Sequence, residues 1–140
     1  MTRKFWIGVI ARDHALMAQK QGVCAFSHGK ETAVAKLSVG DEFLFYAPKT
    51  GVSEGDTVQA FVAHGAVTGD APYQKTWADT EHTAWVRTAS YKPVREVPVK
   101  PMLDDLDFVT NPRYWGMAFR RSLFEITQKD FDRIAKAMQK

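Results

Sequence analysis

The sequence contains little cysteine and no long apolar run. Its 140 residues include one cysteine, Cys24, so no internal disulfide can form, and no Cys/His pairs stand at the spacing of zinc ligands. The apolar run before Arg12 has about seven residues, which is shorter than the core of a signal peptide or a membrane span. These absences predict a cytoplasmic protein in a reducing compartment, without a membrane partner, a bound metal or a cofactor.

Motifs of common enzyme classes are also missing. The chain has no G-x-S-x-G, H-E-x-x-H, P-loop or G-x-G-x-x-G sequence. Its four histidines, at positions 14, 28, 64 and 82, are too scattered to predict a metal site, and a zinc deaminase would need a cysteine pair. Serine, histidine, aspartate and Cys24 are present, but none lies in a recognised catalytic context. The sequence therefore favours a binding protein over an enzyme.

The overall composition is that of an ordinary folded protein with one core. Hydrophobic residues make up 45% and charged residues 25% of the chain, which we interpret as a single domain over residues 1–140. The net charge is +3, and it is distributed unevenly: residues 1–40 carry six basic and two acidic side chains, whereas residues 41–80 carry two and six. The basic N-terminal part is compatible with a phosphate-bearing partner without requiring one.

Apolar periodicity and turn residues predict strands alternating with short helices. The first half is predicted to contain a strand at 5–11, a helix at 13–22 that Asp13 caps and Gly22 ends, a short strand leading into a loop at 27–30, a helical turn near 32–38, a strand at 42–48 that Pro48 stops, and an adjacent antiparallel strand from residue 58 with a bulge or bend at Gly65. The sheet therefore begins early in the chain.

The second half is less regular. It is predicted to contain a long loop over 71–85, an edge strand or irregular extension limited by prolines 93, 98 and 101, a helical turn at 103–108, a strand at 120–126, and a helix after Thr127 and Asp130, which have capping-box spacing. Strands outnumber helices in this interpretation, so the fold class is α+β, built around a curved or closed sheet.

Five segments recur in an order that resembles the EVE domain family. They are W-I-G-V near the start, F-S-H-G-K, L-x-x-G-D-E-F-L-F-Y-x-P-K, G-D-x-P-Y-Q, and W-G-x-x-F-R-R-x-L-F-E-I-T-x-x-D-F near the end. The resemblance covers essentially the whole chain. It implies a PUA-like mixed β pseudo-barrel of about five or six strands with flanking helices, related to YTH domains, and a function in recognising an unpaired or flipped base of DNA or RNA, including methylated or hydroxymethylated bases.

The residues expected to bind that base combine flat rings with hydrogen-bonding groups. A base reader needs an apolar surface for stacking and fixed donors and acceptors at the pairing edge of the base. The candidate binding residues are Trp6, Gly8, Ser27, His28, Gly29, Lys30, Tyr46, Pro48, Lys49, Trp115 and Arg120. Several have a structural alternative: Trp6 and Trp115 as packing residues, 27–30 as a solvated turn, and Lys49 as a solubilising charge.

Strand alternation predicts that only one of two adjacent arginines lines the pocket. In a strand over 120–126, Arg120 and Arg121 would point to opposite faces, and the family pattern favours Arg120 for the pocket. Two further functions remain open from the sequence: an enzyme or sensor that uses the same pocket for a small nucleoside-like ligand, and a protein-interaction module.

Overall fold

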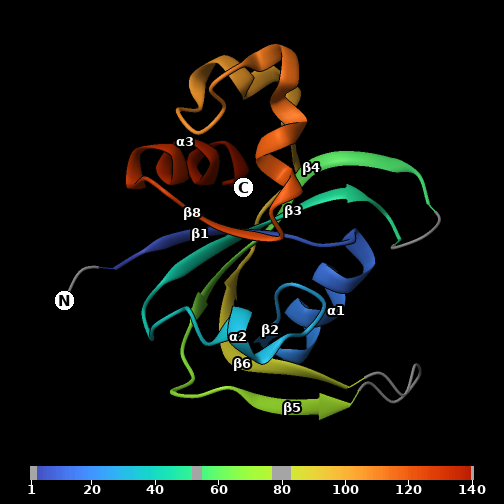
Figure 1. The fold of residues 1–140 in the computed structure, drawn as a ribbon, viewed down its shortest axis with the longest axis vertical. Helices are drawn as coiled ribbons and strands as arrows, with labels where there is room; N and C mark the ends of the chain where they lie inside the picture. Colours follow the sequence, from blue (N-terminus) through green and yellow to red (C-terminus); the bar gives the residue numbers. More distant parts are fainter. Residues whose placement is uncertain (1–2, 52–54, 77–82, 140) are drawn as a thin grey trace.

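The computed structural model describes residues 3–51, 55–76 and 83–139 (Figure 1). Its elements in chain order are β1 (Phe5–Val9), α1 (Arg12–Gln21), β2 (Val23–Cys24), α2 (Glu31–Val34), β3 (Glu42–Lys49), β4 (Thr57–Val67), β5 (Tyr73–Thr76), β6 (Thr83–Lys92), β7 (Val97–Pro98), the 3₁₀ helices η1 (Lys100–Asp105) and η2 (Pro112–Arg120), β8 (Leu123–Ile126) and α3 (Gln128–Met138). None of the helices in these three ranges is long and apolar enough to cross a membrane.

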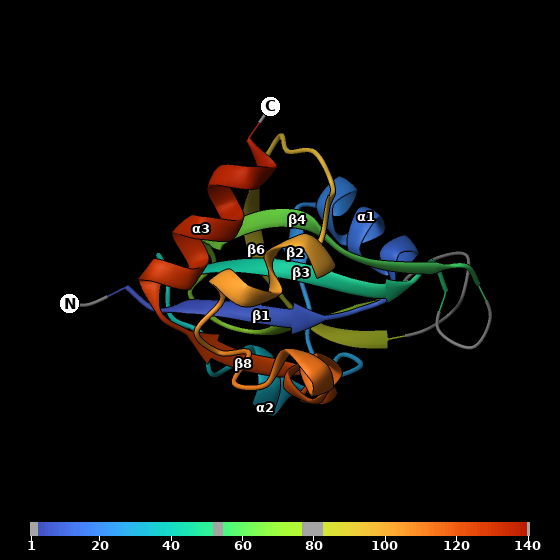
Figure 2. The ribbon, with the colours of Figure 1, turned by 90° about the horizontal axis from the view of Figure 1, so that it is seen from above.

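The strands form one mixed sheet that curls into a half-barrel with helices against its two faces (Figures 1 and 2). Its main order is β2-β6-β4-β3-β1-β8, with β5 paired to β6 and β7 paired to β4. β1 runs parallel to β3 and antiparallel to β8, so segments from the two ends of the chain lie side by side. The predicted α+β fold, a mixed sheet curved into a pseudo-barrel with flanking helices, is confirmed.

Side-chain alternation along the central strands divides the core into two clusters. In β3, Phe43 and Phe45 belong to the cluster beneath α1, whereas Leu44 and Tyr46 belong to the cluster shared with α3 and the 3₁₀ helices. β1 follows the same rule, with Trp6 on the α1 side and Ile7 on the other. Each face of the sheet therefore has its own apolar layer and can carry its own site.

Three buried charged residues join segments that are distant in the sequence. Asp41 is 2% exposed and accepts hydrogen bonds from the Trp6 indole and from the main-chain N–H groups of Lys4 and Ser38. Asp130 likewise accepts from two main-chain N–H groups of the segment after η1. Such bonds offset the large cost of burying a charge, so these residues fix how the segments meet.

Arg87, the third of these residues, lies on β6 and is 3% exposed. Its guanidinium group donates hydrogen bonds to the main-chain carbonyl oxygens of Val34, Leu37, Gly69 and Asp70. No carboxylate of a described residue pairs with it, and carbonyl dipoles stabilise its charge instead. The planar fork of arginine suits this role because it presents several donors in a fixed geometry.

Several predicted elements need correction. The described part of the chain contains eight strands rather than five or six. One of them, β5, falls in the segment predicted to be a loop, and another, β7, is only two residues long. β6 is not an edge strand, since it pairs with β2, β4 and β5. Pro48 does not stop β3, which continues to Lys49 through an irregular register between Ala47 and Lys49. Prolines are tolerated at such irregularities, where a ladder hydrogen bond is already missing.

Gly65 is not at a bulge. It pairs in register with Phe43 and Tyr91, and a Cβ atom there would lie 2.5 Å from the Phe43 ring. The glycine is required by this close approach of an aromatic ring. The register irregularities of β3 and β4 lie elsewhere, after Phe45 and Ala47.

The helix ends agree partly with the sequence signals. Gly22 ends α1 in the left-handed conformation, as predicted, but the N-cap is Ala11 and Asp13 lies in the first turn without capping it. Thr127 caps α3 by accepting a hydrogen bond from the Asp130 N–H. The Asp130 carboxylate does not return to the cap, as a capping box would require, because Asp107 and Phe108 use it.

The segment before β8 differs most from its prediction. Residues 112–120 form the 3₁₀ helix η2, and β8 begins only at Leu123. Arg120 therefore ends a helix and Arg121 follows it, so strand alternation does not apply to them, and both are exposed. The less exposed residues of η2, Trp115, Ala118 and Phe119, have the i, i+3, i+4 spacing of a helix, and the strand predicted from Arg120 overlooked this signal.

Candidate nucleic-acid base site

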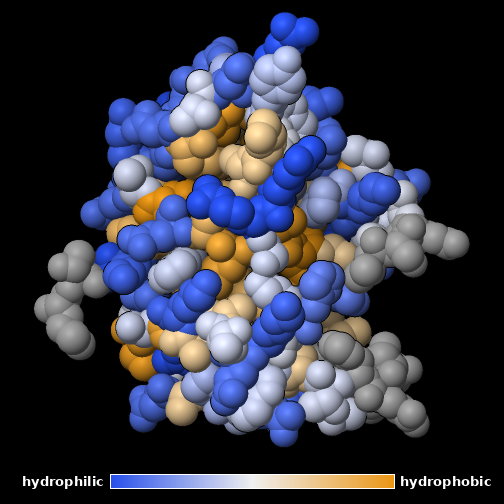
Figure 3. All heavy atoms as spheres, in the orientation of Figure 1, coloured by the Kyte–Doolittle hydropathy of each residue, from blue (hydrophilic) through white to orange (hydrophobic). Residues whose placement is uncertain are grey.

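A cavity of about 420 Å³ opens on the α1 face of the sheet. We call it the α1 cavity. Its walls come from the end of β1, the first turns of α1, the loop after β2, and single residues before β8 and in β6, namely Val9, Ile10, Ala11, His14, Met17, Ala18, Ala25, Phe26, Ser27, His28, Gly29, Ala84 and Ser122. Figure 3 shows apolar residues at the surface near the middle of this view, with hydrophilic residues around them. The volume is within the usual range of small-molecule sites, about 300–1,000 Å³.

The loop after β2 carries an unusual backbone. Ser27, His28 and Gly29 have φ values of 52°, 61° and 79°, three successive residues in the left-handed region. This region is costly for side chains other than glycine, and clusters of such residues are typical of functional sites. Hydrogen bonds from the N–H groups of Gly29 and Lys30 to the Phe26 carbonyl, and from Trp85 to the Gly29 carbonyl, hold the turn in place.

Close packing also fixes this loop. A Cβ atom on Gly29 would lie 2.5 Å from the Ala84 Cβ atom, so only glycine lets the loop approach β6 this closely. On the other side, the hydroxyl groups of Ser27 and Ser122 are hydrogen-bonded at 2.5 Å. The loop is thus held between β6 and the segment before β8, and its polar groups have a defined position at the cavity.

No carboxylate, ammonium or guanidinium group belongs to the residues that line the α1 cavity. Its polar side chains are the hydroxyl groups of Ser27 and Ser122 and the imidazoles of His14 and His28. The Phe26 ring, the Met17 thioether and aliphatic side chains supply the remaining surface. This combination suits an uncharged, flat, polar ligand better than an ionic one.

The geometry of the described residues offers little for covalent chemistry. The two cavity serines bond to each other, and neither forms a hydrogen bond with a histidine among the described residues. Burial raises the pKa of Cys24 to about 12, although nearby Arg87 lowers it in part, so the thiol stays protonated and weakly nucleophilic. Nor does any group of three His, Cys, Asp or Glu residues in the described ranges stand close enough to hold a metal ion.

The comparison with protein families matches residues 4–137 to the EVE domain. The chain belongs to the EVE domain family. Among its relatives, a UPF0310 protein of Mycolicibacterium vanbaalenii is 37% identical over 133 residues, covering 95% of this chain and 91% of the relative. The UPF0310 protein YdcG of Bacillus subtilis is 31% identical over 138 residues, covering 99% and 94%.

Solved structures support the fold of this EVE domain. Protein PSPTO5229 from Pseudomonas syringae aligns with a TM-score of 0.58 at 12% identity, over 95% of this chain and 98% of that protein. Human THYN1, solved in complex with 5-methylcytosine containing DNA, aligns with a TM-score of 0.56 at 11% identity, over 98% of both chains. At these identities the likeness shows the shared fold.

Four of the predicted binding residues are in one place in this EVE domain. Ser27, His28 and Gly29 line the α1 cavity, and Lys30 follows them with an exposed side chain. Gly8 lies beneath: a Cβ atom there would be 2.6 Å from the Phe26 ring, which forms part of the cavity wall. Gly8 therefore supports the wall by making room for the ring.

Trp6 occupies a different environment. Its indole is 7% exposed, packs in the core beneath α1, and donates from Nε1 to the Asp41 carboxylate at 3.1 Å. It is not among the residues that line the α1 cavity. In this structure Trp6 is a packing residue, which was the structural alternative at the sequence level.

Tyr46 lies on the opposite face of the sheet from the α1 cavity. Its ring stacks on Phe119 with centroids 4.0 Å apart, and burial raises its pKa to about 12. Pro48 and Lys49 are exposed at the end of β3 and do not line the cavity. The expected grouping of Trp6, His28, Tyr46 and Arg120 around one base is therefore not formed.

Trp115 and Arg120 are also outside the α1 cavity. Trp115 is partly buried and meets the Phe119 ring edge-on at 6.1 Å, which supports its packing alternative. Arg120 is exposed at the end of η2. Arg121, which was assigned away from the pocket, adjoins the cavity residue Ser122 in sequence and stacks on the Phe124 ring at 4.6 Å.

Three lining residues that could contact a ligand through polar or thioether groups were not predicted from the sequence. His14 and Met17 lie three positions apart on α1 and face the cavity, and Ser122 enters from the far end of the chain. The spacing of His14 and Met17 was a usable signal, because residues at i and i+3 share one side of a helix. Ser122 had none, since its position depends on the antiparallel pairing of β1 with β8.

Proposed function

We propose that this protein binds nucleic acid and takes one unpaired or flipped base into the α1 cavity. The observation that carries the proposal is the uncharged cavity bordered by the left-handed loop Ser27–Gly29. A base removed from its stack needs a neutral, partly apolar enclosure with a few fixed hydrogen-bonding groups. The protein acts in this proposal as a binding module and not as an enzyme.

The side chains around the α1 cavity suit the different parts of a base. Phe26, Met17 and the imidazoles of His14 and His28 offer surfaces that can lie against the faces of a heterocycle. The hydroxyl groups of Ser27 and Ser122 can donate or accept hydrogen bonds at its edge. The apolar wall also accommodates a methyl group, which supports a modified base as the ligand.

Basic side chains flank the lining residues in sequence. Lys30 follows the loop, and Arg121 precedes Ser122, and both side chains are exposed. Cations outside an uncharged cavity are the arrangement expected when the base enters and the phosphates stay at the rim. The DNA complex of the structurally similar human THYN1 contains 5-methylcytosine, which supports testing this modification first.

The test is a titration of fluorescently labelled single-stranded DNA and RNA that carry plain, methylated or hydroxymethylated bases, followed by anisotropy at two salt concentrations. We expect binding that weakens as salt rises, because phosphate contacts release counterions. We also expect a preference for one modified base. Absence of binding to every strand at low salt would overturn the proposal, and binding of free nucleosides without salt dependence would favour a small-molecule sensor.

Variants that preserve the loop backbone make the test specific to the cavity. Ser27→Gly removes the hydroxyl group and His28→Asn replaces the imidazole ring by a shorter amide, while both new residues adopt the left-handed region readily. Both should weaken binding of the preferred base more than binding of its plain counterpart. Lys30→Ala should weaken all strands alike, whereas the matched control Lys100→Ala, exposed on η1, should change little.

A further inference from the structure

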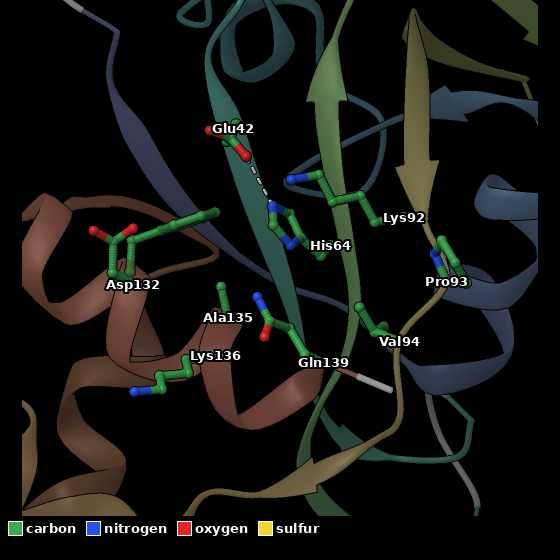
Figure 4. A pocket seen from close by; sticks show the side chains of 10 residues that line it. Glu42, His64, Lys92, Pro93, Val94, Asp132, Ala135, Lys136 and Gln139 are labelled. Carbon is green, nitrogen blue, oxygen red and sulfur yellow. Dashed lines mark hydrogen bonds and ion pairs between the residues drawn. The ribbon is translucent and has the colours of Figure 1, made fainter.

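A second cavity, of about 440 Å³, lies on the other face of the sheet, between α3 and the strands β3, β4 and β6 (Figure 4). We call it the α3 cavity. It shares no lining residue with the α1 cavity. Its polar side chains include His64 and Glu42 from the sheet, Lys92 at the end of β6, and Gln139 after α3.

His64 is the buried polar group of this cavity. The residue is 5% exposed, and its Nε2 atom is hydrogen-bonded to Glu42 Oε1 at 2.8 Å. Its ring meets the Phe131 ring edge-on at 5.1 Å, which fixes the plane of the imidazole. The structure describes no hydrogen-bond partner for Nδ1, and in Figure 4 this second nitrogen is directed into the cavity, toward Gln139.

The Glu42 carboxylate determines which nitrogen of the His64 ring carries a proton. Its other oxygen, Oε2, accepts a hydrogen bond from Arg3 at 2.7 Å. Burial alone would raise the pKa of Glu42, but hydrogen bonds from His64 and Arg3 and the nearby charges of His64 and Lys92 outweigh it, so the pKa is lowered. An ionised Glu42 can only accept, so Nε2 carries the proton of this hydrogen bond, and Nδ1 is a donor as well when the ring is doubly protonated.

The remaining groups favour a ligand with a single negative charge. The Lys92 ammonium group points toward His64 and Glu42, and the Gln139 amide points into the cavity below His64 (Figure 4). Lys136 and Asp132 lie at the outer side of the cavity on α3, where their opposite charges offset each other. No described residue forms an ion pair with Lys92 or Lys136.

The rest of the lining is apolar. Val94 and Pro93 follow β6, and Phe131 and Ala135 face them from α3. A dianionic phosphate would meet this apolar surface, with Glu42 and Asp132 close by and few cations inside. An organic acid would place its carboxylate near the donors and its hydrocarbon part against the apolar wall.

We propose that the α3 cavity binds a small organic monocarboxylate, whose carboxylate accepts hydrogen bonds from His64 Nδ1 and Lys92 while its apolar body packs against Val94 and Phe131. The proposed contact needs a proton on Nδ1 as well as on Nε2, so benzoate binding is expected to weaken at high pH. The charged groups around His64 are Glu42 and Arg3 from the sheet side, Lys92, and Asp132 and Lys136 from α3.

The probe is benzoate, titrated into the full-length protein labelled with ¹⁵N, with the imidazole resonances followed by NMR at pH 5.5 and pH 8. We expect a saturable shift of the His64 ring signals that is weaker at the higher pH. Benzyl alcohol, which has the same ring without the charge, should not compete. Absence of a saturable shift, or an equal shift with benzyl alcohol or inorganic phosphate, would overturn the proposal.

Exposed lysines allow a variant test with little risk to folding. Lys92→Met should weaken benzoate binding roughly twofold to fivefold, the range typical of a partly exposed ion pair. The matched control Lys100→Met removes the same charge on η1 and should leave binding unchanged. Equal effects of both variants, or none from Lys92→Met, would contradict the site. The assay contains no nucleic acid, so it tests the α3 cavity independently of the proposed base reader.

Discussion

The two cavities use different means to position their polar groups. In the α1 cavity the main chain does so, because three successive left-handed residues and a glycine packed against Ala84 hold Ser27 and His28. In the α3 cavity side chains do so, through the chain of hydrogen bonds Arg3–Glu42–His64. The first arrangement depends on shape and the second on charge.

This difference predicts different sensitivities. The shape of a cavity held by backbone geometry should respond most to changes that alter glycine or strained positions and little to pH or salt, although phosphate contacts at its rim still depend on salt. A cavity held by the hydrogen bonds from Arg3 and His64 to Glu42 should respond to protonation, because only the ionised carboxylate accepts from both partners. The substitutions below test this contrast.

The largest effect is expected from Gly29→Ala. The new Cβ atom would meet Ala84 Cβ at 2.5 Å, and the residue would remain at φ 79°. We expect the free energy of unfolding to fall by about 2–4 kcal/mol, measured by chemical denaturation.

Gly40→Ala is the matched control, because Gly40 also has a positive φ, of 93°, but a Cβ atom there would meet nothing within 4 Å. It should cost only the backbone strain, about 1–2 kcal/mol. Equal losses in the two variants would show that the loop does not pack tightly against β6 in solution.

The next effect in size is expected from Trp6→Phe. This change keeps an aromatic ring but removes the indole N–H that donates to buried Asp41, so we expect a loss of roughly 1–3 kcal/mol in thermal or chemical denaturation. Base binding, measured well below the unfolding temperature, should be retained. Trp115→Phe is the control, because the structure describes no hydrogen bond from its indole, and its cost should be smaller. Loss of base binding with full stability would instead return Trp6 to the site.

The glycine and tryptophan positions discussed above also show which features of the fold the sequence could reveal and which it could not. The helix end at Gly22, the strand pattern of β3 and the order of motifs were readable, because local conformation and side-chain periodicity leave direct traces in a sequence. The face on which Tyr46 or Trp6 lies was not, because it depends on the register of β1 against β3 and on which helix covers each face. A one-residue change in register would exchange the faces.

Some residues of the candidate site could likewise be predicted from the sequence, and others could not. The contiguous residues Ser27–Lys30 were found from the sequence because one short loop carries them. Placing Ser122 and Arg120 required knowledge of where β8 begins, because the apolar pattern of 123–126 does not fix the start of that strand. The pairing of Glu42 with His64 also left no trace, since these residues are 22 positions apart on β3 and β4 and meet only through strand pairing.

A smaller effect, and one that depends on pH, is expected from Glu42→Gln. The folded-state pKa of Glu42 is lowered from its ordinary value of 4.5, so its ionised form contributes stability above that value and loses it as the pH falls through the folded-state pKa. The wild-type protein should therefore lose more stability than Glu42→Gln when acidified below about pH 4.5. Denaturation curves at several pH values measure this difference, and parallel pH profiles would contradict an ionised Glu42 paired with His64.

The smallest effect is expected from Ser122→Ala. Its hydroxyl bonds to Ser27 at the α1 cavity, and an isolated hydrogen bond of this kind contributes about 0.5–1.5 kcal/mol. Because the backbone, not this bond, holds the loop, stability should change little. Ser90→Ala, an exposed control on β6, should stay within about 0.5 kcal/mol of the wild type.

Base binding, measured by the anisotropy titration, should weaken in Ser122→Ala and not in Ser90→Ala. A stability loss as large as that of Gly29→Ala would instead mean that side chains, as in the α3 cavity, hold this loop in place.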